Sequence, residues 1–167
     1  HKYDLTITFK EISADQNYNQ GKKFVGVLGV ENAPEVVNCT FDGEVTQGAE
    51  YVNGIYTYRY MQEKSDANTS TLTVNWKDMD DPGWGVALTN PLSTEDVSVK
   101  GVCTYINDVP VIYMGGMFAL SQASNIDLSR LNTSNVISMS GMFGYSQAST
   151  LDLSNLDTSN VIDMSGL

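Results

Sequence analysis

The chain has 167 residues, of which 41% are hydrophobic, and it carries a formal net charge of −11. This length allows one or two domains with a real core. An acidic surface repels the phosphates of nucleic acids, so we expect no nucleic-acid partner. No apolar run approaches the length that spans a bilayer, so we expect no membrane insertion. No signal peptide is visible, which does not exclude one removed before His1.

Residues 1–113 have the pattern of a β-rich domain. Apolar and polar residues alternate at 4–10, as in a half-buried strand. Asn53-Gly54 is the strongest hairpin signal in the chain and leads into a predicted strand at 56–60 with three tyrosines on one face. The other predicted strands are 23–30, 36–41, 71–76, 96–100, 102–106 and 109–113. Strands at intervals of about ten residues predict a β-sandwich or a small barrel.

Two cysteines, Cys39 and Cys103, lie in predicted strands of this region. In an exported protein they would be able to form a disulfide, which would stabilise the fold by roughly 4 kcal/mol in the chain-entropy model. The alternative is two unpaired thiols that serve as small core residues. The sequence leaves both alternatives open.

The stretch from 114 to 167 repeats itself with a period of 25 residues. Met-Gly-Gly-Met-Phe at 114–118 returns as Met-Ser-Gly-Met-Phe at 139–143, and Met-Ser-Gly-Leu at the C-terminus starts a third copy. A fixed period of about 20–29 residues is typical of leucine-rich-repeat solenoids, whose coils bury one another's apolar side chains. We therefore expect Phe118 to lie over Phe143 in the next coil.

Each repeat is expected to contain a short strand and a short helical turn. Asp127 in 126–128 faces away from its two neighbours, as in a strand. Val136, Met139 and Phe143 follow at spacings of three and four residues, which would place them on one helical face. Two glycines in this stretch would limit the helix to a single α or 3₁₀ turn.

Residues 126–143 and 151–166 resemble the BspA-like leucine-rich repeat of bacterial surface proteins. The shared motif is Leu-Asp-Leu-Ser-x-Leu-Asp-Thr-Ser-Asn-Val-x-x-Met-Ser-Gly-Met-Phe. The first copy has Ile126 for Leu, Asn132 for Asp, and Ser138 where Asp or Asn is more usual. The resemblance covers about the last third of the chain. It implies an extracellular or surface-displayed solenoid that adheres to host proteins, other cells or matrix, and similar arrays occur in proteins carried by bacteriophages. The family has no catalytic residues to carry over.

Residues with catalytic or metal-binding patterns are scarce. The segment 78–83 clusters three aspartates but lacks the spacing of a calcium hand, so a solvated turn is expected and no metal. The sole histidine is His1, and we find no Ser–His or Cys–His pairing, phosphate loop or zinc spacing. We therefore predict a non-enzyme without cofactors. The alternative is a glycosidase with two facing carboxylates.

Recognition is expected at solvent-facing positions, because the repeat uses its apolar residues in the core. Trp84 lies among Asp, Pro and Gly residues at 78–85, which predicts an exposed loop with an aromatic anchor. Tyr145 and Arg130 occupy positions that differ between repeats, as a recognition surface would. The alternative is that these positions differ because nothing constrains them.

These patterns predict a mainly β protein with two parts. Residues 1–113 would form the β-rich domain and cap, and residues 114–167 a BspA-like solenoid of two full coils and the start of a third, which we expect to continue beyond Leu167. The predicted function is adhesion or protein and glycan binding by an exported protein at the cell surface, with host or neighbouring-cell partners. The alternative is a structural or host-recognition component of a bacteriophage particle, where it would assemble with other copies or virion proteins.

Overall fold

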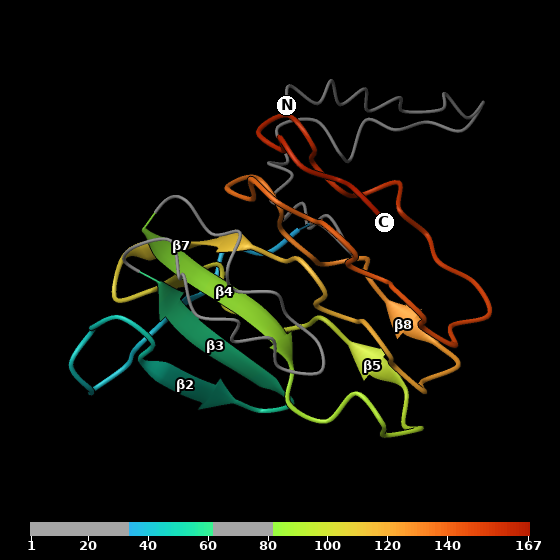
Figure 1. Cartoon of the computed structure of the whole chain (residues 1–167), viewed down its shortest axis with the longest axis horizontal. Helices are drawn as coiled ribbons and strands as arrows, with labels where there is room; N and C mark the ends of the chain where they lie inside the picture. Colours follow the sequence, from blue (N-terminus) through green and yellow to red (C-terminus); the bar gives the residue numbers. More distant parts are fainter. Residues whose placement is uncertain (1–33, 62–81) are drawn as a thin grey trace, which may run out of the picture. The chain divides into compact units, whose positions relative to one another are not determined.

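A computed structural model of the chain describes residues 34–61 and 82–167 (Figure 1). All of them fall within one compact unit. They are mainly β, and no helix occurs in the described ranges. The predicted mainly β class is thus confirmed, whereas the strands predicted at 4–10, 23–30 and 71–76 lie outside the described residues.

Six strands form one mixed sheet in the order β1-β6-β7-β4-β3-β2. Their bounds are Asn38–Cys39 for β1, Glu50–Asn53 for β2, Tyr56–Met61 for β3, Gly83–Leu88 for β4, Tyr105–Ile106 for β6 and Val109–Tyr113 for β7. The sheet curls part of the way toward a barrel, with β2, β3 and β4 side by side (Figure 1). Strands β5 (Val97–Ser98) and β8 (Ile126–Asp127) form a separate parallel pair.

Two tight hairpins set the register of the sheet. Asn53 pairs with Tyr56, so the loop between β2 and β3 is Gly54-Ile55, and Gly54 has a φ of 60°. A positive φ at the first loop position is what a type II′ turn requires and what glycine tolerates. The hairpin predicted at Asn53-Gly54 is therefore confirmed. Asn107 and Asp108 form the other two-residue loop, between β6 and β7, with φ values of 49° and 64°.

Strand β4 lies where the sequence predicts an exposed loop. It pairs antiparallel with β3 and parallel with β7, and all six of its residues are buried. Close packing explains one of its glycines, because a Cβ on Gly83 would lie 2.5 Å from Cδ1 of Ile112. A strand that is covered on both faces shows no alternation of apolar and polar residues. The sequence Gly-Trp-Gly-Val-Ala-Leu therefore does not predict a strand.

Tyrosines and one disulfide join the sheet to the segment between β4 and β6. Tyr56 and Tyr58 are buried; the Tyr56 hydroxyl donates to the Ser98 carbonyl at 2.9 Å, and the Cys103 amide donates to the Tyr58 hydroxyl at 2.8 Å. Burial raises the pKa of both tyrosines above the ordinary range. Cys39 on β1 forms a disulfide with Cys103, which decides the question that the sequence leaves open.

Residues 25 apart in the C-terminal part occupy equivalent positions in the structure. Parallel bridges join Tyr113 to Ser138, Ser138 to Asp163 and Asn125 to Thr150. The rings of Phe118 and Phe143 stack with their centroids 5.4 Å apart and an interplanar angle of 11°. The predicted placement of Phe118 over Phe143 is therefore confirmed.

Successive β-turns form the repeats, and the predicted helical turn is wrong. The Met142 amide donates to the Met139 carbonyl and the Gly144 amide to the Gly141 carbonyl, each three residues back. Gly141 and Tyr145 have φ values of 60° and 57°, which are left-handed and interrupt any helix. The spacing of three and four residues thus reflects turns that each direct one apolar side chain inward.

Burial of the repeated apolar positions falls from one repeat to the next. Leu128 is 2% exposed, whereas Leu153 at the same position is 40% exposed. Met114 and Met139 are fully buried, and Met164 is 42% exposed. The exposed copies of these positions therefore lie within residues 153–164, whereas the copies before them are buried.

Candidate binding surfaces

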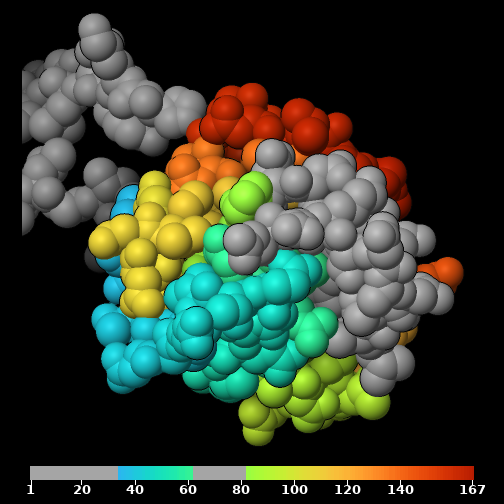
Figure 2. Space-filling view, turned by 60° about the vertical axis from the view of Figure 1, so that its left-hand side comes forward, coloured from blue at the N-terminus to red at the C-terminus, as the bar shows by residue number. Residues whose placement is uncertain are grey.

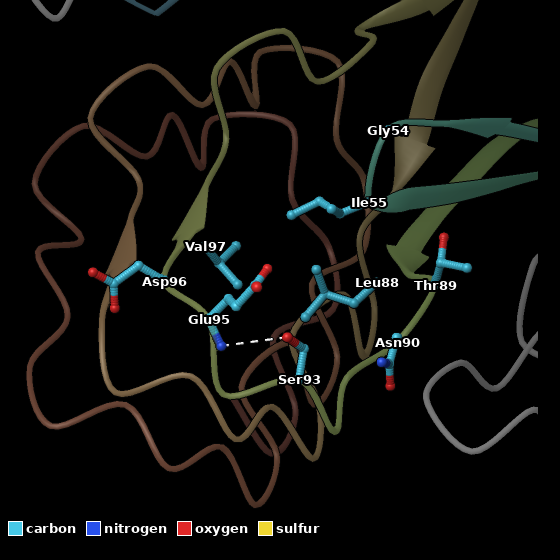
Figure 3. Close-up of a pocket in the computed structure, with 9 residues that line it drawn as sticks. All are labelled: Gly54, Ile55, Leu88, Thr89, Asn90, Ser93, Glu95, Asp96 and Val97. Carbon is cyan, nitrogen blue, oxygen red and sulfur yellow. Dashed lines mark hydrogen bonds between the residues drawn. The ribbon is translucent and has the colours of Figure 1, made fainter.

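A hollow lies where the β2–β3 hairpin meets the segment between β4 and β5 (Figure 3). We call it the hairpin pocket, and its volume is about 300 Å³. Figure 2 shows the hairpin residues, blue-green, beside the yellow-green segment that follows β4 at the molecular surface. The residues that line the pocket are Gly54, Ile55, Leu88, Thr89, Asn90, Ser93, Glu95, Asp96 and Val97.

Backbone hydrogen bonds fix the walls of the hairpin pocket. The Thr89 amide donates to the Ile55 carbonyl at 2.9 Å and ties the hairpin tip to the end of β4. The Ser93 amide donates to the Asn90 carbonyl and closes the turn, and the Ser93 hydroxyl accepts the Glu95 amide at 3.3 Å (Figure 3). A pocket that is held in this way loses little entropy on binding.

The prediction that Trp84 lies in an exposed loop is wrong. Its side chain is 0% exposed on β4 and packs against Phe41 and Tyr60, with ring centroids 5.7 Å and 5.3 Å away. The polar and turn-forming residues before Trp84 suggested a loop, yet the apolar residues after it continue a central strand. The aromatic ring therefore belongs to the core.

Arg130 and Tyr145 lie in different environments. Arg130 forms an ion pair with Glu35, and the Glu35 amide donates to the Arg130 carbonyl at 3.1 Å, so this arginine ties Glu35 to the repeats. Tyr145 is 87% exposed and stands on a turn with a positive φ. Of the three predicted binding residues, Tyr145 presents the freest side chain, and none of the three lines the hairpin pocket.

A second hollow, the repeat groove, follows the outer edge of β8 and the equivalent residues of the next repeat. Its volume is about 320 Å³, and its polar lining comes from Asn125, Asp127, Ser129, Thr150, Asp152 and Asn155, with Ile126 and Leu128 between them. Each aspartate accepts the backbone amide of the serine two residues later, at 3.0 Å in both repeats. One oxygen of each carboxylate thus accepts a hydrogen bond within its own turn.

The same side-chain bond recurs where the repeats differ in residue type. Asn132 Oδ1 accepts the amide of Ser134 at 3.0 Å, and Asp157 at the equivalent position accepts that of Ser159 at 3.0 Å. Asp163 likewise accepts the Ser165 amide at 2.9 Å. Ser138, at the position equivalent to Asp163, accepts the Ser140 amide at 3.4 Å. Aspartate, asparagine and serine therefore replace one another in the repeats because each offers an oxygen to the turn.

These turns predict a small loss of stability in acid. Hydrogen bonds from Ser129 lower the pKa of Asp127, and those from Ser165 lower the pKa of Asp163. A carboxyl whose pKa is lower in the folded protein stabilises it above the unfolded pKa near 3.9 and loses that effect as pH falls through the folded pKa. Carboxyl ¹³C titration should give both groups pKa values below that reference.

The variant Asp163→Asn keeps an oxygen acceptor in this turn but cannot titrate. Below about pH 4, the free energy of unfolding of this variant should therefore depend less on pH than that of the parent chain does. Unchanged acid dependence in this variant, with an ordinary pKa for Asp163 in the parent, would contradict the role given to the turn.

Two further features bear on the function classes. Within the ranges that the structure describes, no three His, Cys, Asp or Glu side chains gather as metal ligands, and Asp78, Asp80 and Asp81 lie outside those ranges. Nor does that part of the chain contain a helical segment able to cross a bilayer.

Residues 98–167 match a family model described as Mycoplasma protein of unknown function, DUF285. The match begins within β5, includes every repeat, and is compatible with the BspA-like resemblance. No curated protein and no solved structure matches the chain. The residues that line the hairpin pocket all precede the segment matched by DUF285.

The hairpin pocket is the feature that sequence reasoning missed. Ile55 follows a turn glycine, and Glu95 precedes a short strand, which are ordinary places for both residue types. The pocket exists because two stretches that are distant in sequence, 54–55 and 88–97, converge at one end of β4. Among the lining residues, Ile55 gives the one signal of the pocket, because it is an apolar residue in the β2–β3 turn and is 48% exposed.

Proposed function

We propose that the chain is a non-enzymatic, exported surface protein that binds a host or neighbouring-cell protein or glycan. We propose further that residues 114–167 are coils of a BspA-like leucine-rich-repeat solenoid. The stacking of residues 25 apart carries this proposal, because it packs repeated apolar side chains of successive coils against one another. Tyr145, 87% exposed, stands where the preceding repeat has half-buried Leu120.

The disulfide supports export to the cell surface. Disulfides persist in oxidising compartments and are rare in the cytosol. Cys39 and Cys103 pair across 64 residues, and no cysteine is left over. The net charge of −11 suits a soluble, surface-displayed module and opposes nucleic-acid binding.

Binding to a panel of glycans and extracellular proteins tests the proposal, and Tyr145→Gly then tests the surface. Binding to any target found should weaken about tenfold, because an exposed aromatic anchor is lost. The fold should persist, since glycine accepts the φ of 57° at this position. Surface plasmon resonance and a thermal melt measure the two effects.

Leu120→Gly is the matched control, because Leu120 has a φ of 61° at the equivalent turn of the first repeat. This variant measures how glycine at a position of positive φ affects binding and stability while Tyr145 is kept. Equal binding by the parent and Tyr145→Gly would place recognition elsewhere, and the absence of any target in the panel would count against the binding function.

A further inference from the structure

The hairpin pocket combines an apolar floor with one carboxylate above it. Ile55, Leu88 and Val97 supply the floor, and the last two are nearly fully buried. The side chain of Glu95 extends between Val97 and Leu88, whereas that of Asp96 points away from the pocket (Figure 3). The pocket thus presents a single negative group over a hydrophobic surface.

No cation in the described part of the chain neutralises Glu95. Neither Glu95 nor Asp96 forms an ion pair there, in contrast to Glu35 and Glu50, which pair with arginines. None of the nine lining residues is basic. The net charge of −11 adds a field that attracts cationic groups. The complementary ligand therefore has an apolar stem and a cationic end.

We propose that the hairpin pocket binds a lysine side chain presented by a partner protein. The four-carbon stem of lysine would cover Ile55 and Leu88 while its ammonium meets Glu95, as long basic side chains do at apolar surfaces. Lysine suits the site better than arginine, because its stem is longer and its charge is a compact point that one carboxylate can meet. This inference rests on the proposed binding function and names the chemistry of one contact.

An NMR titration of the ¹⁵N-labelled chain with Nα-acetyl-lysine N-methylamide tests the pocket without a known target. Saturable shifts should be confined to residues 54–55, 88–90 and 93–97. Nα-acetyl-norleucine N-methylamide has the same stem length without the charge and should bind about fivefold more weakly, the size of one exposed ion pair. Raising the salt concentration should weaken binding of lysine but not of norleucine.

Two neighbouring carboxylates provide matched variants. Glu95→Gln should weaken lysine binding about fivefold and bring it close to that of norleucine. Asp96→Asn removes the same charge from a side chain that points away, and it should change binding less than twofold. Both positions are exposed, so both variants should fold, which a ¹H–¹⁵N spectrum verifies.

The remaining outcomes separate this inference from the proposed function. Shifts outside the pocket, equal binding of norleucine, equal effects of the two variants, or saturation by a methyl glycoside instead of lysine would each overturn the lysine site. If a target from the panel binds Glu95→Gln as well as the parent, the pocket is wrong while the binding function stands. If lysine binds as described but the panel yields no target, the proposed function fails and the lysine site stands.

Discussion

Replacing both cysteines with alanine is expected to lower the free energy of unfolding by about 4 kcal/mol. The disulfide closes a loop of 64 residues in sequence separation and so removes many conformations from the unfolded chain. It also holds β1, a strand of two residues at the sheet edge, against β6. Denaturant unfolding of the parent and the double variant measures the difference.

Alanine is the suitable replacement, because Cys103 is fully buried and a serine hydroxyl there would add its own cost. The reduced parent chain serves as the control, since it keeps both sulfurs and loses only the bond. It should be destabilised nearly as much as the double variant. A loss below about 1 kcal/mol in both cases would contradict the contribution given to the disulfide.

Phe118→Ala is expected to cost about 3–5 kcal/mol, the range for deleting a buried aromatic ring. Phe118 is 0% exposed and stacks on Phe143 of the next repeat. Its amide also donates to the Met142 carbonyl at 2.8 Å, so the cavity would open at the junction of two repeats. Chemical denaturation followed by circular dichroism gives the free energy change.

Phe143→Ala is the matched control in the following repeat. Phe143 is half-buried, so its loss should cost about 1–2 kcal/mol, in proportion to the smaller apolar area that it buries. Equal costs for the two substitutions would mean that burial does not decrease along the repeats. If Phe118→Ala left the free energy of unfolding unchanged, the stacking of Phe118 on Phe143 would be contradicted.

The register of the repeats is predictable from sequence because identity recurs at a fixed interval. Phe118 and Phe143 occupy equivalent places whatever local structure lies between them, so their stacking follows from the period alone. Local structure is less predictable. Val136, Met139 and Phe143 have helical spacing, yet positive φ angles at Gly141 and Tyr145 produce turns instead. Spacing cannot distinguish a helical face from a series of turns with the same interval.

Strand β4 and the hairpin pocket illustrate what a single sequence does not reveal. The residues around Trp84 read as a loop because a strand buried on both faces loses its alternation. Glu95 and Ile55 are 40 residues apart in sequence, and their proximity in the pocket depends on the pairing of β3 with β4. Tyr145 could be predicted as exposed because its position differs between repeats and lies outside the apolar pattern.

In-register stacking of the repeats positions the repeat groove and Tyr145, and NMR couplings across hydrogen bonds test it most directly. The amides of Gly116, Phe118 and Gly141 should couple to the carbonyls of Ser140, Met142 and Ser165, respectively. These amides should also exchange slowly with solvent. Couplings to other carbonyls, or free exchange at all three amides, would contradict the stacking.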